Sequence, residues 1–243
     1  MHRFLLDERS NFEGTSALLS PALQRHLKAA RVSASETFIL SDPETGKAFE
    51  CVLDPATRGR ALVQKPVTLV GTGPVEISLA LGLTKAETLE TAVAGATELG
   101  AARICLFSCG RSPPVKARLD RLEKIAAGAA EVAGRKSPPV LEGPISLEEL
   151  AKTGLGADRK FILWEESGAR GRGASLYKLL REGRPAPKVT LVTGPEGGFS
   201  EKEVDALVAG GFECCSLGPR ILRAATAPAA AIALVQGVWG DLQ

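Results

Sequence analysis

One segment, Lys188 to Phe212, restricts the possible folds more than any other part of the chain. It reads KVTLVTGPEGGFSEKEVDALVAGGF: an apolar run that ends at Thr193, a turn with three glycines and a proline, and a helical pattern. Ser200 and Glu203 form the S-x-x-E capping box that begins many helices. A buried strand, a glycine-rich turn and a helix in this order are typical of a parallel α/β sheet. Ligands of such sheets bind at the carboxyl ends of the strands, so the turn is a predicted ligand site, ahead of the alternative of a tight connection without a ligand.

The same alternation of strands and helices occupies most of the chain beyond Pro74. It predicts a mostly parallel α/β sheet. The alanine-biased stretch from Ala224 to Ala233 fits a closely packed helix. The strand candidates are residues 75–83, 102–109, 160–166, 188–194 and 212–218, and the helix candidates are 85–100 and 114–134, with a short helix after the glycine turn.

The first seventy residues have a different pattern. Short β-rich runs predominate, and the only helical segment begins with Ser20 as the N-cap and Pro21 at the first helical position. Short strands with one helix suggest a small β-barrel. The sequence GTGP, Gly71 to Pro74, is the expected linker. We therefore expect one domain over residues 1–72 and a second over 73–243.

Composition fits a globular protein and gives only weak indications of its partners. Hydrophobic residues make up 44% of the 243 residues, and the formal net charge is +2. The most apolar run, residues 229–239, is too short to cross a bilayer, and the Met1 end has no signal pattern, so we expect a cytoplasmic protein without membrane contact. Basic residues outnumber acidic ones by eight to three from Arg103 to Lys136 and by six to one from Gly168 to Lys188. These two excesses are candidate anion-facing surfaces or simply solvated helix faces.

Several familiar site types are missing from the sequence. There is no GxGxxG fingerprint after a first strand, no P-loop and no GxSxG, and neither His2 nor His26 is placed for a catalytic triad. The five cysteines include no CxxC pair and have no histidine near them, so we expect no metal site. A hydrolase or a nucleotide-hydrolysing enzyme is therefore disfavoured.

A family resemblance rests on the glycine-rich segments. GPEGGFSEKEV, then GF and SLGPRILR at residues 216–223, resemble in order and spacing the C-terminal signature of the ribosomal RNA small subunit methyltransferase E family. ATELGAARI at 96–104, Arg111 with Ser112, and the helix of residues 119–135 resemble further parts of that family. MHRFLL and LSPALQRHL resemble the start of its N-terminal domain.

The resemblance implies a fold, a reaction and a set of partners. The family has a PUA-like β-barrel followed by a SPOUT methyltransferase domain, an α/β parallel sheet with a C-terminal trefoil knot, and it acts as a homodimer. Its reaction transfers the methyl group of S-adenosylmethionine (SAM) to N3 of a uridine in 16S ribosomal RNA, within the small ribosomal subunit, without a metal. It also implies that the barrel is an RNA-binding domain, and that the barrel and the basic segments hold the RNA, with Arg3, Arg111 and Arg118 as the RNA-binding candidates. The cofactor-binding candidates are Trp164, Glu165, Thr193, Gly194, Glu196, Gly197, Gly198, Leu217, Gly218, Arg220, Leu222 and Thr226.

Methylation at N3 poses a specific chemical problem. The sulfonium makes the methyl group electrophilic, so the protein mainly has to align the base nitrogen with it. N3 of a neutral uridine carries a proton, which must be removed, or the developing anion must be stabilised. Arg223 is the candidate catalytic residue, because a cation near O2 or O4 would stabilise that anion. The alternative is that Arg223 bonds to backbone carbonyls and stabilises the knot.

The chain departs from the family pattern at polar positions. Where the family usually has Arg-Thr-Glu-Thr-Ala, this chain has Arg223 followed by Ala224 and Ala225, so the carboxylate is missing. Three explanations stay open: an altered substrate, loss of catalysis with retained binding, or compensation by another acid such as Glu98 or Glu131. The alternative function is thus a non-catalytic relative that binds RNA, with or without SAM, or acts at another RNA site. The other departures are Gly95 in place of a lysine, Gly128 and Val132 in place of Glu and Gln, and Gly110 in place of an acid.

Overall fold

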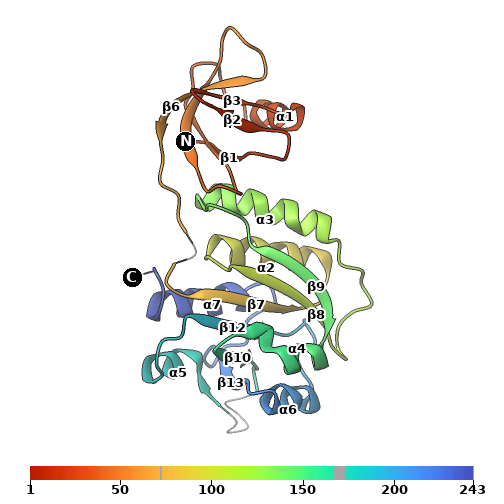
Figure 1. Cartoon of the computed structure of the whole chain (residues 1–243). Helices are drawn as coiled ribbons and strands as arrows, with labels where there is room; N and C mark the ends of the chain where they lie inside the picture. Colours follow the sequence, from red (N-terminus) through yellow and green to blue (C-terminus); the bar gives the residue numbers. More distant parts are fainter. Residues whose placement is uncertain (72, 167–172, 243) are drawn as a thin grey trace. The chain divides into compact units, whose positions relative to one another are not determined.

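The computed structural model describes residues 1–71, 73–166 and 173–242 (Figure 1). The chain forms two compact units. The first contains Met1–Gly71 together with Ala127–Pro138, and the second contains Thr72–Ala126 and Pro139–Gln243. The linker-based division at residue 72 does not anticipate the second segment of the first unit. Within the described residues, no helix is long and apolar enough to cross a membrane.

A six-stranded sheet and one helix form most of the first unit. The strand order is β1-β4-β5-β6-β3-β2, and every pairing is antiparallel except that of β1 with β4. Helix α1 begins as the sequence predicts, because the Ser20 hydroxyl accepts a hydrogen bond from the Leu23 amide at 3.0 Å and Pro21 follows directly. Leu23 and Leu27 face the core of this unit. The elements are β1 (Arg3–Leu5), β2 (Asn11–Glu13), β3 (Ser16–Leu18), α1 (Pro21–Ala29), β4 (Phe38–Ser41), β5 (Ala48–Leu53) and β6 (Arg60–Pro66).

The segment 127–138 is tied to this sheet by hydrogen bonds. It includes the last residues of α3 (Leu119–Ala133). The carboxylate of Glu131 accepts a bond from the Leu5 amide at 2.7 Å, and burial raises the pKa of Glu131. Val70 exchanges backbone bonds with Gly134 and Lys136 on either side of Arg135. The C-terminal part of α3 therefore belongs to the first unit, although the helix begins in the second unit.

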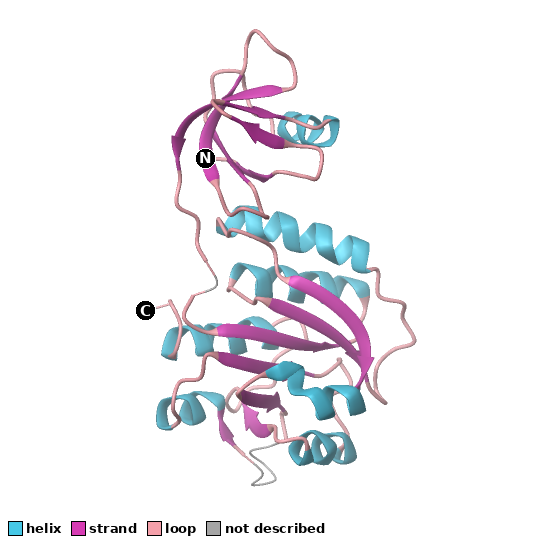
Figure 2. Cartoon of the chain, viewed as in Figure 1, coloured by secondary structure: helices cyan, strands magenta, loops and turns pink. Residues whose placement is uncertain are grey.

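The second unit is built on a seven-stranded sheet in which every described pairing is parallel. The strand order is β11-β13-β10-β12-β7-β8-β9. Figure 2 shows helices on both sides of these strands. The parallel α/β sheet predicted from the sequence is confirmed. The strands are β7 (Glu76–Gly82), β8 (Arg103–Ser108), β9 (Val140–Ser146), β10 (Arg159–Leu163), β11 (Ala174–Ser175), β12 (Lys188–Thr193) and β13 (Glu213–Ser216), and the helices are α2 (Ala86–Glu98), α3, α4 (Leu147–Thr153), α5 (Leu176–Glu182), α6 (Glu201–Ala209) and α7 (Ala227–Val238), with a short 3₁₀ turn, η1, over Gly154–Gly156.

The two faces of this sheet have separate cores, because successive strand residues point in opposite directions. In β10, Phe161 packs with residues of α2, α3, α5 and α7, whereas Ile162 packs with residues of α4 and α6. Leu191 and Val192 of β12 divide in the same way. Both faces are covered, which explains why the central strands read as continuous apolar runs.

The sequence predicts the central strands correctly and misses the edges. In the described part of the chain, strand β9 lies at the edge of the sheet beside β8, and its residues are exposed or half-buried, so it has no apolar run to reveal it. Helix α3 begins at Leu119 rather than near Pro114. The short elements β11, α4 and α5 are also absent from the expectations. Local patterns therefore identify the core of the sheet, which is the part that positions the site.

Candidate functional site

Four strands end side by side at the predicted site. They are β13, β10, β12 and β7, which are neighbours in the sheet. Their last residues are Ser216, Leu163, Thr193 and Gly82. Because all four strands are parallel, the loops that follow them converge at one edge, as expected for ligand sites of α/β sheets.

The glycine turn after β12 is packed too closely for side chains. A Cβ atom at Gly194 would lie 2.9 Å from the Phe199 ring, and one at Gly198 would lie 2.5 Å from a carboxylate oxygen of Glu165. Gly198 also has a φ of +66°, which favours glycine. At the end of β7, a Cβ atom at Gly82 would lie 2.8 Å from the Pro195 nitrogen. The glycines of this turn are therefore required by packing as well as by conformation.

Two charged side chains fix the turn: Arg111 from the loop after β8, and Glu196 of the turn itself. The Arg111 guanidinium donates to the carbonyl oxygens of Gly197 at 2.9 Å and Phe199 at 3.3 Å. The Glu196 carboxylate accepts a bond from the Thr88 hydroxyl at 3.0 Å. These contacts connect the turn to the loop after β8 and to the first turn of α2.

The helix after this turn has the predicted capping box. The Ser200 amide donates to the Glu203 carboxylate at 2.7 Å, and the Glu203 amide donates back to the Ser200 hydroxyl at 3.4 Å. The Gly110 amide also donates to Glu203, at 2.6 Å. Burial alone would raise the pKa of Glu203, but the hydrogen bonds from the amides of Ser200 and Gly110 outweigh it and lower the pKa. Glu203 is therefore ionised at neutral pH and joins the start of α6 to the loop after β8.

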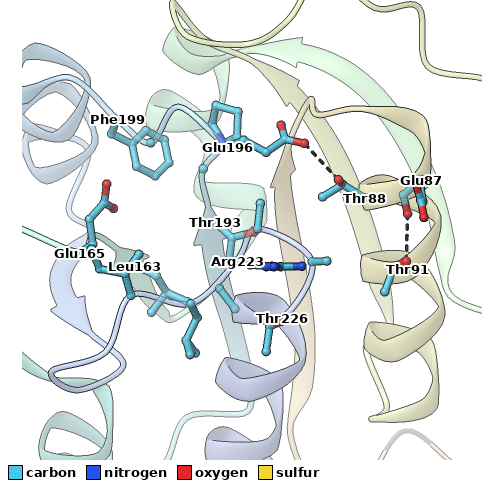
Figure 3. Close-up of a pocket in the computed structure, with 18 residues that line it drawn as sticks. Glu87, Thr88, Thr91, Leu163, Glu165, Thr193, Glu196, Phe199, Arg223 and Thr226 are labelled. Atoms are coloured by element: carbon cyan, nitrogen blue, oxygen red, sulfur yellow. Dashed lines mark hydrogen bonds between the residues drawn. The ribbon is translucent and has the colours of Figure 1, made fainter.

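A cavity of about 680 Å³ lies at this edge of the sheet. Figure 3 shows side chains of α2 on one side of it and Glu165 on the other, with Arg223 between them. Among the described lining residues there are three carboxylates and one cation, Arg223. The lining residues are Glu87, Thr88, Thr91, Leu163, Glu165, Thr193, Gly194, Pro195, Glu196, Gly198, Phe199, Ile221, Leu222, Arg223, Ala224, Ala225, Thr226 and Ala227.

One polar atom of the lining is buried without a partner. The Thr193 side chain is 2% exposed, and among the described residues its hydroxyl has no hydrogen-bond partner. A buried hydroxyl left in this state costs free energy of about 1–3 kcal/mol. Because Thr193 lines the cavity, a polar ligand there could satisfy it.

The second turn forms a smaller cavity of about 80 Å³ beside the first. It follows β13, and Gly218 at its centre has a φ of +103°. Both cavities share Leu163, Glu165, Ile221, Leu222 and Ala227. The predicted residues Trp164, Glu165, Leu217, Gly218, Arg220 and Leu222 all line the smaller cavity.

Known proteins share this arrangement. A family model described as an RNA methyltransferase domain matches residues 72–236. The ribosomal RNA small subunit methyltransferase E of Bacillus subtilis is 32% identical over 168 residues, 67% of this chain and 66% of that protein. That of Synechocystis sp. is 27% identical over 239 residues, 98% of this chain and 78% of that protein. The crystal structure of the enzyme from Neisseria gonorrhoeae bound to S-adenosyl methionine is 30% identical with a TM-score of 0.86, over 100% of both chains. The chain belongs to the ribosomal RNA small subunit methyltransferase E family.

The structure brings together nearly all cofactor candidates that the family resemblance implied. The larger cavity contains Glu165, Thr193, Gly194, Glu196, Gly198, Leu222 and Thr226, together with Arg223. Gly197 lines neither cavity, and its carbonyl accepts a hydrogen bond from Arg111. Trp164 is buried in the core beside α4 and α6, so its contribution to the smaller cavity is small.

The three RNA-binding candidates lie outside both cavities. Arg3 belongs to the first unit. One of its guanidinium nitrogens lies against Gly134, in the space that a Cβ atom there would occupy. Arg111 holds the glycine turn. Arg118 is exposed and pairs with Asp120 at 3.2 Å. Their role in RNA binding stays a prediction.

In the described residues, the two basic segments contribute fewer exposed, unpaired cations than their residue counts suggest. Arg103 and Arg121 pair with Glu142 and Glu90, and Arg135 is buried. In the segment from Gly168 to Lys188, Arg170 and Arg172 lie outside the described residues. The charge counts therefore do not identify an anion-facing surface by themselves.

The departures from the family pattern fall into two groups, those that line the larger cavity and those that lie outside its lining. Ala224 and Ala225 line the larger cavity, so the missing carboxylate is missing from the site itself. Val132 is 77% exposed, and nothing lies within 4 Å of a Cβ atom at Gly128. An acid at Gly110 would stand beside the Glu203 carboxylate, since a Cβ atom there lies 3.2 Å from it.

Neither acid proposed as a replacement for the missing carboxylate lines the cavity. Glu131 belongs to the first unit and bonds to Leu5, and Glu98 is exposed at the far end of α2. The acid that the sequence reasoning missed is Glu87, which lines the cavity with Thr88 and Thr91. The position of β7 beside β12 puts the start of α2 at the site, and only the sheet order reveals this. Among the described residues, no group of three or more His, Cys, Asp or Glu side chains could hold a metal ion.

Proposed function

We propose that the chain is a SAM-dependent methyltransferase that modifies N3 of a uridine in 16S ribosomal RNA of the small subunit. The observation that carries the proposal is the cavity at the ends of β7, β10 and β12, with its glycine cradle and its buried, unpartnered Thr193 hydroxyl. Family membership supports RNA methylation, and the Neisseria gonorrhoeae relative is a SAM complex.

The residues of the site fit SAM in charge and in shape. SAM carries a sulfonium, an ammonium and a carboxylate group and is positive overall, and among the described lining residues Glu87, Glu165 and Glu196 outnumber the one cation. Backbone groups of the two glycine turns would hold the adenosine; in the first turn, Gly194 and Gly198 leave no room for a side chain. The Thr193 hydroxyl would gain a hydrogen-bond partner. The larger cavity, at about 680 Å³, is in the range of small-molecule sites.

Within this proposal, Arg223 stabilises the uridine anion that forms as N3 loses its proton. Its side chain is exposed in the cavity lining, and among the described residues the guanidinium has no hydrogen-bond or ion-pair partner. An arginine that stabilised a knot would bond to backbone carbonyls. The free guanidinium therefore supports the role in substrate binding. SAM supplies the electrophilic methyl group, and the protein aligns the base with it.

The family also supports three architectural proposals. We assign the first unit to the PUA-like barrel, the segment Leu217–Thr226 with α7 to the trefoil knot, and this region with α7 to a homodimer interface. Ile221, an apolar side chain that is 82% exposed at the second turn, supports a partner surface there. Analytical ultracentrifugation of wild-type protein and Ile221→Asp tests the dimer: a monomeric variant is expected, and an unchanged dimer contradicts this interface.

Two measurements test the enzymatic function. Isothermal titration with SAM should show binding, and no heat at millimolar SAM would remove the proposal. Transfer of a labelled methyl group to small subunits from a strain without the modification should then give N3-methyluridine. Matched subunits that already carry the modification are the control.

A second candidate is a non-catalytic relative that binds RNA. Ala224 and Ala225 favour it, because they remove a hydroxyl and a carboxylate from the cavity lining. SAM binding without methyl transfer to the unmodified subunits is the result that would select this candidate.

A further inference from the structure

The larger cavity, at the ends of β7, β10 and β12, offers few groups that could take the proton from uridine N3. Among its described lining residues there is no histidine, cysteine, lysine or tyrosine. The titratable lining groups that can accept a proton are three carboxylates, those of Glu87, Glu165 and Glu196. Ala225 stands where the family usually has a carboxylate, so the second glycine turn supplies no acceptor of its own.

Glu196 is already used by the fold. Its carboxylate accepts a hydrogen bond from the Thr88 hydroxyl at 3.0 Å and one from the Lys85 amide at 3.4 Å. Lys85 is the N-cap of α2, and its side chain makes no capping bond. Glu196 therefore satisfies an amide that the start of the helix leaves free, and a proton on its carboxylate would weaken that bond.

Glu165 lies beside the glycine turns. One of its carboxylate oxygens lies 2.5 Å from the position of a Cβ atom at Gly198, so the side chain packs against the first turn. It also lines the smaller cavity, which the second turn forms. Under the proposed function the two turns hold SAM, so Glu165 is placed to contact SAM rather than the uridine.

Glu87 differs from both of these acids. It lies in the first turn of α2, on the side of the larger cavity away from Glu165 (Figure 3), and it does not line the smaller cavity. Its backbone carbonyl accepts a bond from the Thr91 hydroxyl at 2.9 Å, but its carboxylate forms no hydrogen bond or ion pair with any described residue. The next acid of α2, Glu90, is instead bonded to Arg121.

Arg223 and Glu87 are complementary in what they can do to a uridine. Both line the larger cavity, and Figure 3 shows Arg223 between Glu165 and the side chains of α2. A guanidinium near O2 or O4 stabilises the uridine anion, but it has no acceptor site for the N3 proton. A carboxylate supplies that acceptor. The two side chains together meet both chemical requirements of methylation at N3.

We propose that the Glu87 carboxylate is the general base that accepts the N3 proton during methyl transfer. The inference rests on the proposed function. The N3–H bond breaks and its proton passes to Glu87, while the N3 electron pair forms a bond to the methyl carbon. The bond between that carbon and the sulfur breaks, and its electron pair stays on the sulfur. The products are N3-methyluridine and S-adenosylhomocysteine, and Glu87 then releases the proton to water.

The test compares two substitutions at this position in the full chain. Glu87→Gln keeps the shape of the side chain and removes its basicity, whereas Glu87→Asp keeps a carboxylate. Glu98→Gln is the matched control, because Glu98 is an exposed residue of the same helix that lines neither cavity. Single-turnover transfer of a labelled methyl group to unmodified small subunits is measured from neutral to alkaline pH. Calorimetry with SAM, binding to small subunits and thermal melts accompany every variant.

Glu87→Gln should slow the single-turnover step at neutral pH by about 10²–10⁴-fold, the usual contribution of a general base. Its rate should rise toward that of the wild type as the pH increases, because uridine ionises by itself in alkaline solution and then needs no base. Glu87→Asp should retain more of the rate than Glu87→Gln, and Glu98→Gln should match the wild type. The affinities for SAM and for small subunits should change by less than about tenfold in every variant, since the exposed carboxylate has no partner to lose.

Three outcomes overturn the proposal and can be told apart. If Glu87→Gln transfers the methyl group as fast as the wild type, the proton has another acceptor while the methyltransferase function stands. If its rate is lowered equally at every pH, or falls in step with its SAM affinity, Glu87 positions the substrate or the cofactor and is not the base. If the wild type binds SAM but transfers no methyl group to unmodified subunits, the proposed function fails and the general base fails with it.

Discussion

The two glycine turns of the site differ in how firmly the chain holds them. The turn from Gly194 to Phe199 is closely packed. Arg111 bonds to two of its carbonyls, and the turn lies so close to Gly82 that a Cβ atom at Gly82 would have no space. The turn after β13 is open. Nothing lies within 4 Å of a Cβ atom at Gly218, and Ile221 is 82% exposed.

The helices after the two turns repeat this difference. Helix α6 begins with a complete capping box, whereas Thr226 at the start of α7 makes no side-chain capping bond. The first turn is thus determined by contacts within the second unit. Leu217 packs against the core, but among the described residues no side-chain hydrogen bond holds the second turn, so we expect a ligand or a second copy of the chain to hold it.

The largest expected effect on stability comes from Gly82→Ala, which disrupts the close packing of the first turn. The new Cβ atom would lie 2.8 Å from the Pro195 nitrogen and 3.0 Å from the Gly194 carbonyl carbon, and neither backbone atom can move freely. Overpacking of this kind costs about 1–3 kcal/mol. Chemical denaturation should show the loss of stability, and SAM titration a weaker affinity.

Gly128→Ala is the matched control for that substitution. Gly128 lies in α3 with nothing within 4 Å of its added Cβ atom, so alanine should stabilise the helix by about 0.5–1 kcal/mol. If Gly82→Ala were as stable as wild type, the first turn would be less firmly held than its packing indicates, and the contrast between the turns would disappear.

Arg111→Met should have the next largest effect. It removes both donors from the carbonyls of Gly197 and Phe199 while keeping an unbranched side chain. A hydrogen bond from a charged group contributes about 1.5–3 kcal/mol, less where solvent reaches it, so a loss of about 1–2 kcal/mol and weaker SAM binding are expected. Urea denaturation and calorimetry measure these changes.

Arg118→Met is the control, since the Arg118 guanidinium forms an exposed ion pair with Asp120 and does not bond to the turn, and such surface pairs contribute about 0–1 kcal/mol. Equal effects of the two substitutions on SAM affinity would show that Arg111 does not act through the turn. If Arg111→Met changed only the affinity for RNA, its predicted role as an RNA contact would account for the result instead.

The predictability of the site follows from the same contrast. The first turn was predictable because strand, glycines and capping box are adjacent in sequence. The contribution of Glu87 and Thr88 was not, because it depends on β7 lying beside β12, and sheet order leaves no local pattern.

The fold shows the same limit. The buried strands β7, β8, β10 and β12 produce apolar runs because both of their faces are covered. Strand β9 lies at the edge and produces none, and segment 127–138 joins the first unit through contacts distant in sequence.

Glu203→Gln tests the capping box with a smaller effect. The folded-state pKa of Glu203 is lowered, so its contribution is present above the unfolded value of 4.5 and is lost as pH falls through the folded value. At pH 7 the substitution should destabilise the protein by up to about 1 kcal/mol, reduced by solvent screening. The difference from wild type should shrink as the pH is lowered below 4.5.

The control for pH is Glu123→Gln, an exposed glutamate of α3 that forms no ion pair with the described residues. Its stability should follow wild type from pH 7 to low pH. A pH-independent effect of Glu203→Gln would mean that the side chain acts through shape rather than charge, and the start of α6 would then resemble the uncapped start of α7.

Ala225→Glu should change stability least, and its effect on methyl transfer is the most informative. Ala225 lines the cavity two residues before α7 begins, where a carboxylate interacts favourably with the helix N-terminus by about 0.3–1 kcal/mol, and Glu87, Glu165 and Glu196 oppose it by repulsion. The net change should lie within about 0.5 kcal/mol of zero.

Because the new carboxylate can orient Arg223 or accept the N3 proton, methyl transfer to small subunits should rise, with Ala225→Gln as the uncharged control. A rise only with Glu means that the open second turn is a weakened form of the family's active site. Loss of SAM binding with Glu, retained with Gln, would mean that this turn has been rebuilt around a ligand that tolerates no further negative charge.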